Sequence, residues 1–265
     1  QDTSIRIRSK NLEAEQKALE IDQDREFARL LQEREIAKQH LDKFPYLSLA
    51  WGLGNLVCWL SMWVLCLNGI LPLWVGFIVA TINIAACYLP SHEAQHSIFA
   101  MPGKSKRWLN ELVGHLSPIP LVMPFSVLRA THMEHHKHAN DPELDPDYDH
   151  HYDTVLGFLW GSLQWRQPQP FGREHPYARC LKRIGREDLL LLSAGYRLVY
   201  LGILCGTALN GLAIEVALLW WLPWQIGITY TQFYLSWAPH NPGCGTDRYN
   251  DTQSFKSRLG NIWSS

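Results

Sequence analysis

The chain has 265 residues, with 24 basic and 25 acidic side chains, and a net charge of −1 does not indicate a nucleic-acid partner. The mean hydropathy is slightly negative, but the charge is unevenly spread: residues 1–44 are rich in charged groups and residues 46–90 have none. Twelve Trp residues is a high number for this length, and Trp favours membrane interfaces. These features argue against a simple soluble domain.

The N-terminal part of the sequence predicts a polar helical arm. Residues 11–42 are rich in Glu, Lys, Arg, Gln, Ala and Leu, with Asn11 as a candidate N-cap and many oppositely charged pairs four residues apart. The apolar positions drift too much for a coiled coil, so a solvated or interfacial arm is expected. We therefore divide the chain into an arm at 1–44 and a membrane domain at 45–265.

Four apolar runs follow, and they predict an all-α membrane protein. Leu47–Leu67 and Leu71–Leu89 are each about 20 residues long, the length that crosses a hydrocarbon core of roughly 30 Å. Only a tight turn fits between them, so they form a helical hairpin. Leu189–Leu209 and Val216–Trp237 form a second pair, which gives four transmembrane helices in two hairpins.

The basic residues predict the orientation of these helices. Arg197 lies inside an apolar run, where it either reaches the interface or faces a partner inside the bundle. Every other Lys and Arg falls in 1–44, 104–187 or 248–258, which four crossings place on one side. By the positive-inside rule this side is the cytoplasm, so the N-terminus and the segment between the hairpins are cytoplasmic.

The segment between the hairpins predicts a helical cap. Trp108–Leu128 alternates apolar and polar residues around Pro118 and Pro120, and Val155–Trp165 is short, apolar and bears Trp. Both fit helices that lie in the plane of the membrane interface.

The histidines are the strongest chemical signal. His92 and His96 are four residues apart, and His132, His135 and His136 have spacings of three and four, which place each set on one helix face. Imidazoles in such sets suit Zn, Cu, Fe or Ni, and the lack of cysteine ligands argues against a structural zinc site. We therefore expect a histidine-rich metal centre in the cap.

The residues after the second set supply acceptors for the ligand imidazoles. The stretch 140–147 contains four acidic residues, and we expect Asp141 to accept a hydrogen bond from a ligand. His138 lies on another helix face and is a further candidate for the site. His150 and His151 lie in an acidic stretch, where solvation is expected.

His240 closes the fourth apolar run, so it reaches the same membrane face as both histidine sets. On local grounds an interfacial histidine and a metal ligand are equally good interpretations.

Three segments resemble the membrane fatty acid desaturase and hydroxylase superfamily: HEAQH at 92–96, HMEHHKHANDPELDPD at 132–147 and WAPHNPGCGTDRYNDT at 237–252. The resemblance covers roughly residues 45–262 and is closest to acyl-lipid desaturases and carotenoid ring hydroxylases. It implies two iron ions above the cytoplasmic ends of a four-helix stem. The residues that match the family's iron ligands are His92, His96, His132, His135, His136 and His240.

The sequence departs from the family in one respect. The family has a third histidine motif after the fourth span, whereas no histidine follows His240 in this chain. Asp247-Arg248-Tyr249 matches the motif that follows the family's histidine at this place, and residues 258–265 resemble the lead-in to the third motif. We therefore expect a truncated chain in which the shell of the second iron is incomplete.

The resemblance also implies the chemistry. A di-iron centre would use O2 to remove hydrogen from an unactivated C–H bond of a long apolar lipid, most simply in fatty acyl desaturation. A carotenoid ring or alkane hydroxylase is the alternative, and a non-enzymatic membrane metal-binding protein is a more distant one. A separate ferredoxin, rubredoxin or cytochrome-type donor would supply electrons. The candidate surface for this donor, or for lipid headgroups, comprises Arg179, Lys182, Arg183 and Arg186.

Overall fold

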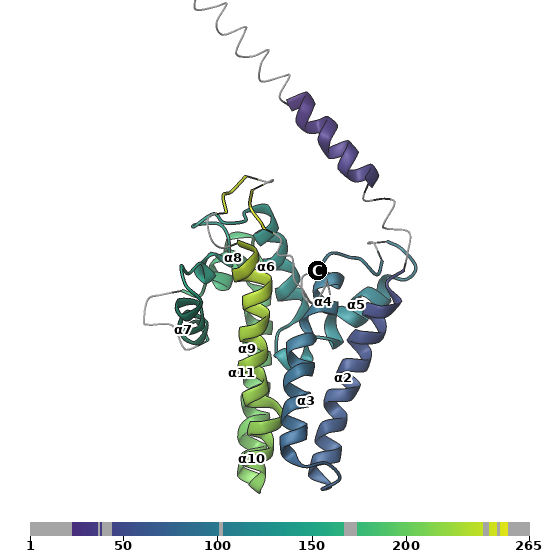
Figure 1. Cartoon of the computed structure of the whole chain (residues 1–265), viewed down its shortest axis with the longest axis vertical. Coiled ribbons are helices and arrows are strands. Elements are labelled where there is room, and N and C mark those ends of the chain that lie inside the picture. Colours follow the sequence, from purple (N-terminus) through teal and green to yellow (C-terminus); the bar gives the residue numbers. More distant parts are fainter. Residues whose placement is uncertain are drawn as a thin grey trace, which may run out of the picture. The chain divides into compact units, whose positions relative to one another are not determined.

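The computed structural model describes residues 23–36, 38, 44–100, 103–166, 174–240, 244–247 and 250–253, and all regular elements in these ranges are helical (Figure 1). The chain forms two compact units, Gln1–Pro45 and Tyr46–Ser265. In the first unit a helix covers residues 23–36, with Phe27 and Leu31 exposed. The rest of the predicted helix at 11–42 falls largely outside the described residues.

The first two apolar runs form the expected helices. Helix α2 covers Tyr46–Leu67 and α3 covers Leu73–Ala86, and the tight turn between them has Gly69 at a φ of +69°. After Cys87 the chain continues as α4, Tyr88–Gln95, so the second helical path is longer than the apolar run alone. Both paths are long and apolar enough to cross a membrane.

The third membrane-length path runs from Asp188 to His240 and is bent back on itself. Asn210 and Gly211 leave helical geometry, with Gly211 at a φ of +87°. Along a continuous helix, residues 200 and 220 would lie about 30 Å apart. The rings of Tyr200 and Trp220 are instead 4.9 Å apart, which requires the chain to reverse between them.

The helices of this path are α9 (Asp188–Thr207), α10 (Ala213–Val216), α11 (Leu222–Gln232) and α12 (Ala238–His240). Wider helical turns join them, at Ala208–Leu212, Ala217–Trp221 and Phe233–Trp237. Such turns change the direction in which the following side chains point.

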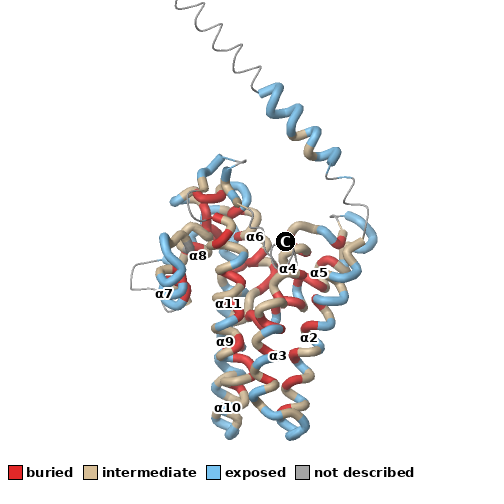
Figure 2. The backbone as a smooth tube through the Cα atoms, in the orientation of Figure 1, coloured by how far each residue is buried: buried red, intermediate tan, exposed pale blue. Residues whose placement is uncertain are grey.

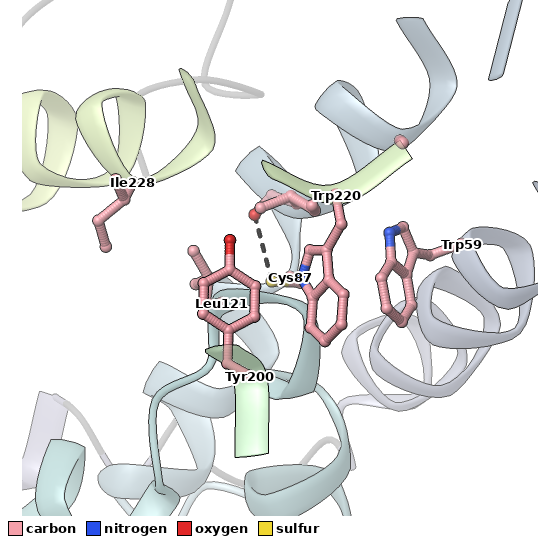
Figure 3. Packing of buried hydrophobic residues seen from close by; sticks show 8 residues of the cluster. Trp59, Cys87, Leu121, Tyr200, Trp220 and Ile228 are labelled. Atoms are coloured by element: carbon pink, nitrogen blue, oxygen red, sulfur yellow. Dashed lines mark hydrogen bonds between the residues drawn. The ribbon is translucent and has the colours of Figure 1, made fainter. Parts of the chain in front are cut away.

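Close packing of α3 against α11 holds the two halves of the membrane unit together. A Cβ atom at Gly227 would lie 2.7 Å from Cγ2 of Ile84 and 3.1 Å from the backbone nitrogen of Ala85. Glycine therefore lets the two backbones approach closely, as in many membrane helix pairs. Nearby, Trp59, Trp220 and Tyr200 pack edge to face, as Figure 3 shows.

The outer surface of the apolar helices is exposed, and Figure 2 shows buried positions mainly on their inner sides. Leu191 and Leu198 of α9 are 79% and 69% exposed. Such an apolar surface suits contact with lipid. Arg197 is also exposed, so of its two expected environments the bundle interior is excluded.

The stretch Trp108–Leu128, expected to lie in the interface plane, is divided between several helices. It forms α5 (Arg107–Leu116), the short helix η1 (Ile119–Leu121) and α6 (Phe125–Lys137), with a bend of 97°. Proline explains the break, because it lacks an N–H and disfavours helical geometry in the residue before it. Three prolines, Pro118, Pro120 and Pro124, lie in this connection.

The remaining helices of the second unit are short. They are η2 (Tyr148–His150), α7 (Val155–Trp165) and α8 (Pro176–Arg183), and α7 has the predicted bounds.

Candidate metal centre

Helix α4 is fixed on α5 by buried polar contacts at the end of the apolar helices. Ser91 donates a hydrogen bond to the carbonyl of Gly114 at 3.1 Å, and the side-chain amide of Asn110 donates to the carbonyl of Ala94 at 3.0 Å. Each of these bonds satisfies a buried backbone oxygen, so the orientation of α4 is well determined. His92 and His96 follow from that orientation.

Four imidazoles from α4 and α6 converge, and we call His92, His96, His132 and His136 the first histidine group. The Nε2 atoms of His96 and His132 are 2.9 Å apart, those of His132 and His136 are 3.0 Å apart, and those of His96 and His136 are 3.2 Å apart. The ligand atoms of all four lie within 4.8 Å of one another.

The three distances between the Nε2 atoms of His96, His132 and His136 fit a common metal ion. Imidazole nitrogens at about 2.1 Å from a metal and at right angles to one another are about 3.0 Å apart. Mutual hydrogen bonding does not explain them as well, because a neutral imidazole has one N–H and three Nε2 atoms meet here. Imidazole ligands suit iron as well as zinc, copper and nickel.

The electrostatics favour the neutral, ligating form of this group. Burial lowers the pKa of His96. Burial, together with the neighbouring imidazoles, lowers the pKa of His136 to about 4. A metal ligand must be unprotonated, so these shifts prepare the nitrogen lone pairs for a cation at neutral pH.

His135 turns away from the first group and meets His240, and we call these two the second histidine group. Their Nε2 atoms are 3.2 Å apart, although the residues are 105 positions apart in sequence. At about 100° per residue, His135 points about 100° away from His136, whereas His132 and His136 differ by only about 40°. His135 is about 60° from His132, so it lies at the edge of the expected face, where it pairs with His240 and not with the first group.

Each imidazole of the second group is held from behind by an oxygen. Nδ1 of His135 donates to the carboxylate of Asp145 at 2.8 Å, and Nδ1 of His240 donates to the backbone carbonyl of Asp251 at 2.8 Å. Both Nε2 atoms then face each other, so a proton or a metal ion must lie between them. The residues are 4% and 5% exposed, so little water reaches this gap.

The charge of Asp145 opposes the effect of burial on His135. Burial disfavours the imidazolium, but the hydrogen bond to Asp145 and the charges of Asp147 and Asp251 raise the pKa of His135 overall. Burial likewise disfavours the carboxylate of Asp145, but its bond to His135 lowers the pKa of this carboxyl overall. His240 differs, because burial and the neighbouring His135 lower its pKa. His135, beside Asp145, is therefore the favoured place for a positive charge in the metal-free site.

Two other predicted site residues lie outside both groups. The carboxylate of Asp141 accepts hydrogen bonds from the backbone N–H groups of Glu143 and Leu144, which makes a local turn. His138 ends α6 and lies 3.8 Å from the carboxylate of Glu134. The carboxylate of Asp145, in place of that of Asp141, contacts a histidine of the second group.

His151 corrects another expectation, since we expected it to be solvated. Its Nε2 lies 3.0 Å from the amide oxygen of Asn140 and its Nδ1 lies 2.8 Å from the carbonyl of Tyr148. Its ring lies 6.4 Å from that of His240. The side chain of His150, the residues Arg248 and Tyr249, and the segment 254–265 lie outside the described part of the chain.

The candidate donor surface on α8 is largely neutralised. Lys182 pairs with Glu174, Arg183 pairs with Glu134 at 3.2 Å, and Arg186 pairs with Asp188. The bond of Arg183 joins α8 to α6, the helix that contributes histidines to both groups. This contact therefore supports the site, and a free basic patch would have to lie elsewhere.

Comparisons with known proteins agree with this geometry. The family described as fatty acid desaturase matches residues 68–265. An sn-1 oleoyl-lipid 12-desaturase of Anabaena variabilis is 34% identical over 106 residues, 40% of this chain and 29% of the relative. Dihydrorhizobitoxine desaturase of Bradyrhizobium elkanii is 26% identical over 193 residues, 65% of this chain and 52% of the relative.

A third relative performs another oxidation, as its name states. Zeaxanthin 4-ketolase of Chlamydomonas reinhardtii is 34% identical over 62 residues, 23% of this chain and 13% of the relative. No solved structure matches the chain. The matched stretches span less than a third of the first of these relatives. The family match covers most of the sequence, and the chain therefore belongs to the fatty acid desaturase family.

Proposed function

We propose that the protein is a membrane di-iron oxidoreductase that uses O2 to oxidise an unactivated C–H bond of a long apolar lipid, and that its reaction is fatty acyl desaturation. The observation that carries this proposal is the set of Nε2 distances of 2.9–3.2 Å in the first histidine group. Membership of the desaturase family supports iron as the metal and a lipid as the substrate.

The two histidine groups would hold one iron ion each. The first group would provide four imidazoles, and the second would provide His135 and His240 with further ligands. When bound, the iron pair supplies the redox chemistry that activates O2. The chain's own residues keep the ligands in place: Asp145 fixes the tautomer of His135, and the carbonyl of Asp251 fixes that of His240.

We propose that the helices cross the membrane four times, as two hairpins, with the histidine groups and the N-terminus on the cytoplasmic side. The reversal between Tyr200 and Trp220 supports two crossings in the third helical path. The turn at Gly69 and the turn at Gly211 lack Lys and Arg, which agrees with the positive-inside rule.

A separate electron donor is part of this proposal. An sn-1 acyl-lipid omega-3 desaturase (ferredoxin) of Nostoc sp. (strain 36) is 32% identical over 63 residues, which supports a ferredoxin-type donor.

Hydroxylation or ketonisation of a carotenoid ring is the second candidate, and the similarity to zeaxanthin 4-ketolase favours it. Both candidates use the same metal centre and differ in where the substrate carbon lies relative to it.

Mass spectrometry of lipids from cells that express the complete gene tests the two candidates. Desaturation gives acyl chains that have lost two hydrogens, whereas the second candidate gives carotenoids that have gained oxygen. The same gene carrying His132→Ala is the control and should give neither product. If an iron-loaded protein changes neither acyl lipids nor carotenoids, the proposed function is wrong.

A further inference from the structure

Asn140 lies in the loop after α6 and has a backbone conformation that restricts the residue type. Its φ is +66°, in the left-handed region, where Asn and Gly are tolerated better than other residues. The residue is 6% exposed. A buried polar side chain in this position requires partners for each of its polar atoms.

The structure provides those partners from three segments of the chain. The backbone N–H of Asn140 donates to the second carboxylate oxygen of Asp145 at 2.8 Å. Its side-chain amide group donates to the carbonyls of Gly245 at 2.7 Å and Asp251 at 2.8 Å. Its amide oxygen lies 3.0 Å from Nε2 of His151. All four distances are typical of good hydrogen bonds.

Two of these partners are the groups that orient the second histidine group. Asp145 accepts from Nδ1 of His135 through its other oxygen, and the carbonyl of Asp251 also accepts from Nδ1 of His240. Asn140 thus contacts both supporting oxygens at once. The first histidine group has no such connection to Asn140 among the described residues.

We infer that Asn140 is a positioning residue that sets the distance and orientation between His135 and His240, and hence the affinity of the second metal position alone. This inference rests on the proposed function, because it assumes that the second histidine group binds metal. Loss of this residue should leave the four imidazoles of the first group in place.

The chemistry of the amide explains why an isosteric change should be harmful. Asn140→Asp keeps the size and the acceptor oxygen but removes both N–H donors. It also places a carboxylate oxygen against the carbonyls of Gly245 and Asp251, which are acceptors too. Asn140→Gly keeps the left-handed backbone and the bond to Asp145 but removes the three side-chain bonds.

Cobalt binding to the metal-free, full-length protein in detergent tests the inference. Co2+ alone is titrated and followed by its visible absorption, which resolves strong and weak binding. In Asn140→Asp and Asn140→Gly we expect the Co2+ affinity of one position to fall by about 10- to 100-fold, the usual effect of residues that support ligands. The Co2+ affinity of the other position should change by less than about threefold. Asn250→Asp is the matched control, since this exposed residue lies in the segment that supplies Gly245 and Asp251 and its side chain bonds Asp247.

The outcomes separate this inference from the proposed function. A wild-type protein that binds no Co2+ would overturn the metal centre itself. A wild-type protein that binds two, with both positions unchanged in the Asn140 variants, would overturn only the role of Asn140. Equal weakening of both positions would also overturn it, because a general loss of fold affects both.

Discussion

The two histidine groups differ in how the chain builds them. The first comes from α4 and α6, and its members are related by spacings of four residues within each helix. The second joins His135 to a residue 105 positions away, and it depends on a carboxylate, a backbone carbonyl and an asparagine. Helical spacing therefore sets each pair of the first group, and the packing of α4 against α6 brings the two pairs together, whereas the second group joins segments far apart in the sequence. We expect single substitutions to affect metal binding at one group more than at the other.

The largest effect should come from the centre of the first group. In His132→Ala the Nε2 atom that lies 2.9 Å and 3.0 Å from its neighbours is lost. We expect retention of iron at this position to fall by more than about 100-fold, since even residues behind a ligand contribute 10- to 100-fold.

Iron content per chain and product formation measure this effect. His138→Ala is the matched control, because His138 ends the same helix and faces Glu134. Equal losses in both variants would mean that the first group has no special role.

Asp145→Asn tests the support of the second group. The amide keeps the size of the side chain but removes the charge that stabilises Nδ1–H of His135, so we expect metal affinity there to fall by about 10- to 100-fold. The metal at the first group should be retained. Asp141→Asn is the control, because Asp141 only closes a local turn. Isothermal titration with Fe2+ under anaerobic conditions checks both variants, and equal affinities would contradict the assignment.

The fold dependence of the second group can be tested at a distance from it. Gly227→Ala forces α11 away from Ile84 of α3, and the helical path continues from α11 to α12, which ends at His240. Overpacking of this kind destabilises by about 1–3 kcal/mol. We expect a lower thermal midpoint in detergent and weaker metal binding at the second group than at the first. Gly202→Ala adds a methyl group where no atom lies within 4 Å, so it should be neutral.

The smallest expected effect is a difference in the response to acid. His136 has a lowered pKa of about 4, so below about 6.5 the unfolded chain binds protons that the folded, metal-free group does not. Stability from this group is therefore lost as the pH falls from about 6.5 toward 4. His135 has a raised pKa, so its contribution is present below about 6.5 and is lost as the pH rises through its folded pKa.

Thermal unfolding of the metal-free protein between about pH 4 and pH 7 measures these contributions. His136→Gln should flatten the loss of stability toward low pH, whereas Asp145→Asn should make it steeper. The same slope in both variants would show that the two groups do not differ in charge preference.

The sequence predicts the parts of the molecule that follow a local rule. The length of the apolar runs predicts the membrane-length helices. The four-residue spacing of the histidines predicts which imidazoles of the first group share a helix face. Pro118 and Pro120 marked a possible break in Trp108–Leu128, but the sequence did not indicate the bend of 97° between α5 and α6.

Asp145, rather than Asp141, contacts His135, and no periodic pattern distinguishes these two carboxylates. The reason lies in contacts between distant segments. Asn140 and His151 join the site through Asp251 and Gly245, which are more than 90 residues further along the chain than either of them. The acidic stretch indicated where such partners lie, and the fold selects among them.

Iron analysis of the purified full-length protein, combined with Mössbauer spectroscopy, tests the central claim most directly. We expect two iron ions per chain in nitrogen-rich environments, one of which is lost selectively in His132→Ala while the other binds more weakly in Asp145→Asn. Fewer than one iron per chain, with all six histidines of the two groups intact, would contradict it.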